Sequence, residues 1–263
     1  MDLELTGRRA FVSGSTQGIG YAIARALLAE GASVVINGRR EAAVQGAVER
    51  LRDELPGAEA SGIAADVERP DEVARLLGAL GEVDILVNNV GLFEVAAFDD
   101  VLDEEWRRYF EVNVMSGVVL SRHLLPRMLE SGWGRILFIS SEAGVNVPAD
   151  MVHYGATKAA QLAVANGLAK LTRGTGVTVN SVLGGPTYSD GVAQAVDRIA
   201  RGQGIPAAHL KAAIAAENRT SLLERFIEPS EIAALVTYLA SPLSSATNGA
   251  ALRADGGVLT TVV

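Results

Sequence analysis

The feature that most restricts the fold of this chain is a regular alternation of short apolar runs with longer helical stretches. Most of the apolar runs are continuous, a pattern typical of strands buried on both faces of a parallel sheet. Strands are expected at 9–14, 33–37, 60–65, 84–89, 134–140, 177–183 and 250–255, and helices at 19–30, 41–54, 71–80, 103–130, 153–172 and 229–240. This order predicts an α/β fold, a single domain over 1–263 with a doubly wound parallel sheet of about seven strands and helices on both faces.

Composition argues against several classes of function. The 263 residues carry a formal net charge of −8 with no dense Lys/Arg cluster, which argues against nucleic-acid binding. No apolar run reaches the roughly 18–20 residues of a membrane span, and the amino terminus lacks the features of a secretory signal. Cysteine is absent, and His123, His153 and His209 show no metal-ligand spacing. We therefore expect a cytoplasmic protein that binds no membrane and no metal and acts on a small molecule.

A glycine-rich turn follows the first expected strand. In VSGSTQGIG, residues 12–20, glycines stand at 14, 18 and 20, directly before the first expected helix. Gly14 can adopt a positive φ, Gly18 lets a pyrophosphate approach the backbone, and Gly20 lets helix and strand pack closely. The free N–H groups of the helix amino terminus attract phosphate. The turn predicts a dinucleotide site, although a glycine-rich turn without a ligand has the same pattern.

A second motif lies in the expected helix 153–172. Tyr154 and Lys158 in HYGATKAA are four positions apart and therefore share one helix face. A nearby ammonium favours the phenolate and so lowers the pKa of a tyrosine. The pair alone does not distinguish a proton-transfer site from an ordinary helix surface.

Together these motifs resemble the short-chain dehydrogenase/reductase family. The resemblance rests on the glycine turn, on NNVG at 88–91, on Asn113, on Ser141 thirteen residues before Tyr154, on Lys158 and on DGG at 255–257. It covers residues 5–257 and implies a Rossmann-type fold and an enzyme that transfers a hydride between a nicotinamide cofactor and a ketone or secondary alcohol.

The resemblance also implies roles for individual residues. Tyr154 would exchange a proton with the substrate oxygen, Lys158 would lower the pKa of Tyr154 and hold the nicotinamide ribose, and Ser141 would hydrogen-bond the reacting oxygen. Asn113 would hold a water that connects Lys158 to solvent. The implied cofactor contacts are Gly14, Ser15, Gly18, Ile19, Gly20, Arg39, Asp66, Val67, Asn89, Gly91, Tyr154, Lys158, Pro186 and Thr187. Ser140 and His153, which adjoin catalytic positions, are expected to be structural.

The end of the second strand bears on the choice of cofactor. An acidic residue there binds the ribose 2′-OH of NAD, whereas arginine accommodates the 2′-phosphate of NADP. The chain has Gly38 followed by Arg39 and Arg40, which favours NADP(H) over NAD(H). Gln17 argues the other way, because NADP-preferring relatives often carry a basic residue there.

Residues 188–226 occupy the place of the family's substrate lid, with two helical stretches hinged near 202–206. The predicted site is flanked by largely apolar residues, which favour an apolar ketone or a 3-oxoacyl group over a sugar: Leu92, Phe93, Val147, Met151 and Tyr188. Helix 153–172 is apolar over more than one face and so needs a second partner; in the family this is the same helix of a neighbouring subunit, which implies a homotetramer. Two alternatives remain open: a nucleotide-binding regulatory protein on the same fold, and a family member that performs dehydration or epimerisation.

Overall fold

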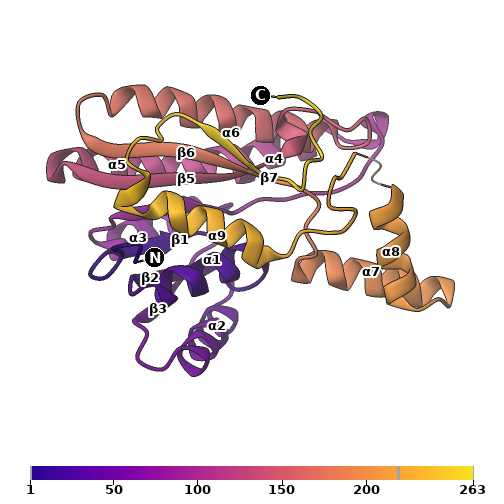
Figure 1. Cartoon of the computed structure of the whole chain (residues 1–263), viewed down its shortest axis with the longest axis horizontal. Coiled ribbons are helices and arrows are strands. Elements are labelled where there is room, and N and C mark those ends of the chain that lie inside the picture. Colours follow the sequence, from indigo (N-terminus) through magenta and orange to yellow (C-terminus); the bar gives the residue numbers. More distant parts are fainter. Residues whose placement is uncertain (1, 218–219, 263) are drawn as a thin grey trace.

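The computed structural model describes residues 2–217 and 220–262, and its centre is one parallel sheet (Figure 1). The strand order is β3-β2-β1-β4-β5-β6-β7, and every pairing is parallel. The strands are β1 Arg9–Val12, β2 Ser33–Gly38, β3 Ala60–Ala64, β4 Ile85–Asn88, β5 Trp133–Ser141, β6 Gly176–Gly184 and β7 Ala251–Ala254. The order reverses between β1 and β4, where a doubly wound sheet opens a crevice at the carboxyl ends of its strands.

Helices cover both faces of the sheet. Helices α1, α2 and α9 bury apolar residues on one face, and α3, α5 and α6 do so on the other. The helices are α1 Gly18–Ala29, α2 Glu41–Glu54, α3 Pro70–Leu80, α4 Asp103–Phe110, α5 Ser116–Ser131, α6 Val152–Leu171, α7 Asp190–Gln203, α8 Ala207–Glu217 and α9 Pro229–Ala240. The expected fold class is confirmed.

Buried strands explain why the sequence shows continuous apolar runs. In β1, Ala10 and Val12 face the core beneath α1, whereas Phe11 packs in the core beneath α5. Successive side chains of a strand point to opposite faces, so both faces must be apolar when both are covered.

The expected helix 103–130 is divided. Helix α4 runs into a π-helical turn at Glu111–Met115, and α5 begins only at Ser116. A π turn holds one extra residue per turn, and such turns are frequent at functional sites. Because the π turn spans only 5 residues, the apolar pattern there is too short to reveal it.

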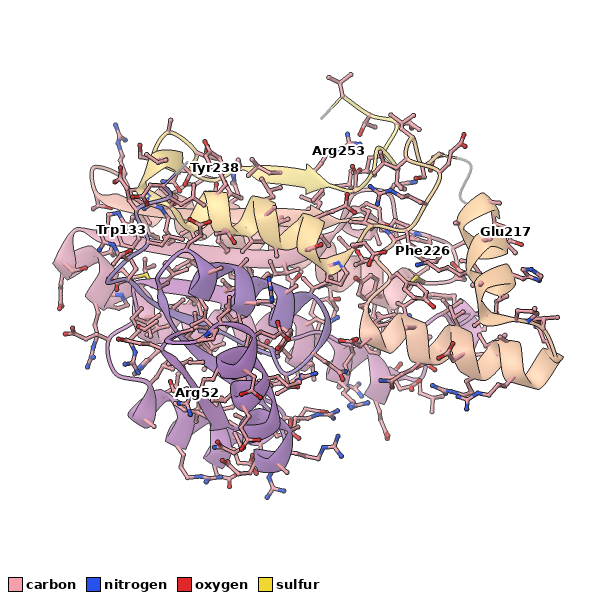
Figure 2. The ribbon with its side chains drawn as sticks, turned by 60° about the horizontal axis from the view of Figure 1, so that its bottom comes forward. Arg52, Trp133, Glu217, Phe226, Tyr238 and Arg253 are labelled. Atoms are coloured by element: carbon pink, nitrogen blue, oxygen red, sulfur yellow. The ribbon has the colours of Figure 1, made fainter. Side chains whose placement is uncertain are left out.

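Helices α7 and α8 project from one end of the molecule (orange in Figure 1) and make up most of the segment 188–226. Gly204 ends α7 with a φ of +66°, so the two expected helical stretches are separated within 202–206, and the hinge itself stays a prediction. Figure 2 labels Phe226 where this segment returns to the body; its ring lies 5.5 Å from that of Tyr188. Lys211 of α8 lies 3.6 Å above the Tyr188 ring.

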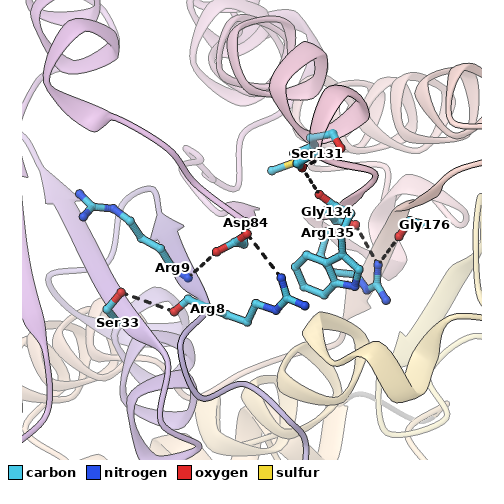
Figure 3. A network of polar contacts seen from close by, with 10 residues as sticks. Arg8, Arg9, Ser33, Asp84, Ser131, Gly134, Arg135 and Gly176 are labelled. Atoms are coloured by element: carbon cyan, nitrogen blue, oxygen red, sulfur yellow. Dashed lines mark hydrogen bonds and ion pairs between the residues drawn. The ribbon is translucent and has the colours of Figure 1, made fainter.

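At the amino ends of the strands, polar contacts join neighbouring strands and the loops before them (Figure 3). Asp84 accepts a hydrogen bond from the Arg9 amide at 2.8 Å and pairs with Arg8. Arg135 donates to the carbonyls of Gly134 and Gly176. Across the described residues, none of the helices is both long enough and apolar enough to cross a bilayer.

Candidate active site

The glycine turn between β1 and α1 is held in a fixed shape. Gly14 and Gly18 adopt positive φ values of +61° and +62°. A Cβ on Gly20 would lie 2.5 Å from both Asn89 Nδ2 and the Gly14 carbonyl oxygen. Asn89 donates to the carbonyls of Ser13 and Gly14, at 3.0 and 2.9 Å. Each glycine is therefore required by backbone conformation or by close packing.

A cavity of about 320 Å³ lies beside this turn, at the carboxyl ends of β1, β2 and β4. Nine of the residues that the family resemblance assigns to the cofactor line it: Gly14, Gly18, Ile19, Gly20, Arg39, Asp66, Val67, Asn89 and Gly91. A side chain at Gly91 would project toward Lys158 Nζ and Asn113, at 3.5 and 3.6 Å from its Cβ. The missing side chain leaves that space open, so the residues fit an extended dinucleotide.

The remaining assigned contacts lie elsewhere. Ser15 is buried; its hydroxyl donates to Val12 O at 2.6 Å and accepts the Asn37 N–H. The Thr187 hydroxyl donates to the Gly185 carbonyl at 2.8 Å. Pro186 adjoins Thr187 on the strand-like stretch leading to α7. Ser15 is thus committed to holding the turn against β2 rather than facing the cavity.

The cavity also has an acidic neighbour that the sequence reasoning missed. Gly18 N–H, at the amino terminus of α1, donates to Asp190 Oδ2 at 2.6 Å. Asp190 opens α7, so the start of this helix reaches the turn that the sequence assigns to phosphate. A carboxylate at a helix amino terminus is itself favourable. This N–H therefore binds a carboxylate here, and a phosphate at the same position would have to displace Asp190.

An arginine-rich hollow of about 550 Å³ adjoins the end of β2. Arg39 and Arg40 line it as the sequence anticipates, and α2 adds Arg50, which donates to the Thr16 carbonyl at 2.8 Å. Arg50 was not anticipated; the small residues Ala43 and Ala47 precede it on the same helix face and could have indicated it. A Cβ on Gly38 would lie 2.6 Å from Thr16 Cγ2, so an aspartate there would require Thr16 to move.

Tyr154 and Lys158 meet on α6 beneath the end of β5. Lys158 Nζ lies 5.6 Å from the Tyr154 ring centroid. The ammonium donates to the Ile139 carbonyl at 2.8 Å and to Gln161 Oε1 at 3.2 Å. Burial lowers the pKa of Lys158 to about 8, and the Glu142 carboxylate opposes that effect. An ammonium has three N–H donors, so one donor remains for a further partner.

Gln161 connects two of the predicted catalytic residues. Its Nε2 donates to the Asn113 carbonyl at 2.6 Å while its Oε1 accepts from Lys158. Gln161 therefore links the backbone of Asn113 to Lys158. The water that the resemblance implies between Lys158 and solvent stays a prediction. Gln161 was missed, although its position three residues after Lys158 in an alanine-rich helix was a usable signal.

Asn113 lies in the π turn, and its side chain fixes the segment after β4. Asn113 Oδ1 accepts the Leu92 N–H at 2.7 Å, and Nδ2 donates to the Leu92 carbonyl and to Thr157 Oγ1. The side chain is fully buried. Asn113 therefore ties the segment after β4 to α6.

Ser141 ends β5. Its hydroxyl donates to the carboxylate of Glu142, the next residue, and accepts the Ala143 N–H at 3.1 Å. A hydrogen bond also joins it to Tyr154. The structure thus brings Ser141, Tyr154, Lys158 and Asn113 together as the sequence predicts.

The pKa of Tyr154 differs from the expectation. Burial raises it to about 12, although the hydrogen bond with Ser141 opposes the rise, and Glu142 raises it further. The sequence predicted a lowering by Lys158. Loss of water around the phenol disfavours the phenolate, and the negative charge of Glu142 disfavours it further. Tyr154 consequently keeps its proton near neutral pH.

The two neighbours expected to be structural are confirmed in that role. The Ser140 hydroxyl donates to the Lys158 carbonyl at 3.0 Å, away from Tyr154. His153 is buried, with its ring 4.4 Å from the Tyr109 ring. Among the described residues, no group of three or more His, Asp or Glu side chains is placed to hold a metal ion.

Comparison with known proteins defines the class. The family model for short chain dehydrogenases matches residues 8–199, and the chain belongs to the short-chain dehydrogenase/reductase family. It is an NAD(P)-dependent oxidoreductase that acts on alcohol and ketone groups.

Particular relatives align over the whole length. The chain is 48% identical to the uncharacterized oxidoreductase YvaG of Bacillus subtilis (strain 168), over 100% of both chains. It is 34% identical to a D-beta-hydroxybutyrate dehydrogenase of Cupriavidus necator, over 96% of this chain and 98% of the relative. The crystal structure of L-sorbose reductase from Gluconobacter frateurii, complexed with NADPH and L-sorbose, superposes with a TM-score of 0.93 at 29% identity, covering 100% of both chains.

Proposed function

We propose that the protein reduces a ketone to a secondary alcohol and prefers NADPH. The observation that carries the proposal is the arrangement of Tyr154, Ser141 and Lys158 next to a cavity that ends at Arg39. The raised pKa of about 12 keeps Tyr154 protonated at neutral pH, which is the state that a proton donor in a reduction needs. The NADPH complex of L-sorbose reductase is consistent with this choice.

The residues divide the binding of the cofactor between them. Gly14, Gly18 and the α1 amino terminus would hold the pyrophosphate. Arg39 would hold the 2′-phosphate, and Asp66 with Val67 the adenine. The remaining N–H of Lys158, together with Tyr154, would hold the nicotinamide ribose. The bound nicotinamide supplies the hydride.

Side chains of the protein would carry out the proton transfer. The Tyr154 hydroxyl donates its proton to the carbonyl oxygen as that oxygen gains negative charge. The Ser141 hydroxyl stabilises the same oxygen, since preorganised donors stabilise a developing oxyanion better than water does. The Lys158 ammonium stabilises the phenolate that Tyr154 becomes, and Gln161 and Asn113 hold Lys158 in place.

The substrate class follows from the flanking residues. Phe93 and Val147 are exposed near the site. Tyr188 begins the segment 188–226, which we propose is the substrate lid, and its ring lies under Lys211 of α8. An apolar ketone or a 3-oxoacyl group suits this lining. The L-sorbose of the Gluconobacter complex makes a hydroxylated ketone the second candidate.

We also propose that the protein is a cytoplasmic homotetramer. Phe93, Val95, Phe98 and Leu102 are each more than half exposed and follow one another between β4 and α4. An apolar surface of this kind marks an association site. A monomeric mass in light scattering at micromolar concentration would contradict the assembly.

Arg39→Gln tests the cofactor preference. A charge-assisted hydrogen bond contributes about 1.5–3 kcal/mol, and about 1.4 kcal/mol is a tenfold change. We therefore expect the wild type to favour NADPH over NADH by about 10- to 100-fold in kcat/KM, and the variant to lose most of that preference. The measurement uses a panel of uncharged ketones with both cofactors.

Arg122→Gln is the matched control, because Arg122 is an exposed arginine of α5 and its loss changes the net charge equally. It should retain the wild-type ratio. Equal use of NADH and NADPH by the wild type would contradict the preference, and Gln17 would then have been the better guide. Absence of turnover with every ketone, despite nucleotide binding, would instead favour the regulatory alternative.

A further inference from the structure

Glu142 is a carboxylate at the centre of the proposed site that the catalytic scheme does not use. It directly follows Ser141, begins the short turn Glu142–Gly144, and is half-buried. Its carboxylate accepts the hydrogen bond of the Ser141 hydroxyl. Because a hydroxyl has one proton, the proton that Ser141 would offer to a substrate oxygen points toward Glu142.

The surroundings of Glu142 do little to neutralise it. Its turn packs against β6, which carries no charged side chain, and against α6, which contributes Tyr154 and Lys158. Lys158 gives its hydrogen bonds to Ile139 and Gln161 and acts on Glu142 only through space. Directly after β7, Asp255, which pairs with Arg253 at 2.9 Å, adds a second negative charge. Across the described residues, no lysine or arginine forms an ion pair with Glu142.

We propose, building on the ketone reduction proposed above, that Glu142 is a specificity-determining residue: it directs the site toward uncharged ketones and against ketones that carry a carboxylate near the reacting carbonyl. A substrate oxygen bonded to the Ser141 hydroxyl lies within two hydrogen-bond lengths, about 5–6 Å, of the Glu142 carboxylate. A substrate carboxylate one or two carbons away lies at a similar distance. Like charges at this range in a partly buried site repel by enough to change kcat/KM about 10- to 100-fold.

The preference for uncharged over anionic ketones should depend on pH, because it requires Glu142 to be ionised. Burial raises the pKa of the Glu142 carboxyl, and Asp255 raises it further, while Ser141 and the backbone amides oppose the rise. The carboxyl therefore takes up a proton at a higher pH than an ordinary glutamate. A protonated carboxyl no longer repels an anionic substrate, so the discrimination is greatest at high pH and shrinks as the pH falls.

Matched pairs of ketones, beginning with acetoacetate and methyl acetoacetate, test the proposal with NADPH as the reductant. The wild type should favour the ester by at least about 10-fold in kcat/KM. Glu142→Gln removes the charge and keeps the shape, and should narrow the ratio by about 10-fold, chiefly through faster reduction of acetoacetate. Glu94→Gln is the control, because Glu94 is an exposed carboxylate on the segment after β4 that raises the pKa of Tyr109. The ester-to-acid ratio of this variant should equal that of the wild type.

A second measurement follows the same ratio with pH. The ratio of ester to acid in kcat/KM should fall more steeply toward low pH in the wild type than in Glu142→Gln, where Lys158 is the buried group of the site that still titrates. If the ester is turned over but the ester-to-acid ratio of kcat/KM is the same in wild type and Glu142→Gln at every pH, the role of Glu142 alone is overturned. Absence of turnover for both members of every pair would overturn the proposed reduction, and this inference with it.

Discussion

Two buried cations lie near opposite ends of β5, and they serve different purposes. Arg135, 1% exposed, is at the amino edge of the sheet, and Lys158, 5% exposed, is beneath the carboxyl edge. Both donate to backbone carbonyls: Arg135 to Gly134, Gly176 and Ser241, and Lys158 to Ile139. No described carboxylate forms an ion pair with either one.

The difference between them is chemical. Burial lowers the pKa of Arg135 to about 10, so the guanidinium stays charged at neutral pH, and it stacks 4.5 Å from the Trp133 ring. Burial lowers the pKa of Lys158 to about 8, so the ammonium can release its proton in the range where enzymes work. Burial lowers both pKa values, but Arg135 stays charged and binds backbone carbonyls at the amino edge of the sheet, whereas Lys158 can titrate at the carboxyl edge.

Lys158→Met should give the largest effect in this comparison. Loss of the ammonium removes the stabilisation of the Tyr154 phenolate and should reduce kcat for ketone reduction by at least about 10²-fold. The midpoint of thermal unfolding should change little, because relief of the buried charge offsets the donor that the Ile139 carbonyl and Gln161 lose. Lys170→Met, on the exposed side of the same helix, should change neither quantity. Near wild-type turnover in Lys158→Met would show that Lys158, like Arg135, has only a structural role.

Arg135→Met should have the opposite profile. The carbonyls of Gly134, Gly176 and Ser241 lose their donor, and a buried acceptor without a partner is costly. The free energy of unfolding should fall by about 2–4 kcal/mol, measured by urea denaturation. Turnover per folded molecule should stay within about twofold, since Arg135 lies at the edge remote from the site. Arg127→Met, an exposed change on α5, should leave the stability near that of the wild type.

The same comparison explains how far the sequence predicts the structure. Buried strands must be apolar on both faces, so β1, β2, β4, β5 and β6 could be located to within about two residues. The π turn at Glu111–Met115 could not, because it spans only 5 residues. Nor could the role of Arg135, since a lone arginine in an apolar run does not reveal its carbonyl partners.

For the site, the family spacing predicted which residues meet but not their chemistry. Ser141, Tyr154, Lys158 and Asn113 converge as expected. The pKa of Tyr154 is raised rather than lowered, because burial raises it and the Glu142 carboxylate adds to the rise. Gln161 and Glu142 act through contacts that appear only when α6 packs under β5. Burial and through-space contacts of this kind depend on the folded chain and are not visible in sequence spacing.

The pH dependence of ketone reduction tests the central claim most directly. The pKa of Lys158 is lowered to about 8, so its ammonium is present below that pH and is lost as the pH rises through it. Tyr154, with a pKa near 12, keeps its proton over the same range. We predict that kcat with saturating NADPH and ketone declines with a midpoint near pH 8, while the protein stays folded by circular dichroism. A kcat that stays constant up to pH 10 would show that the charge of Lys158 does not control the reaction, and would contradict the account.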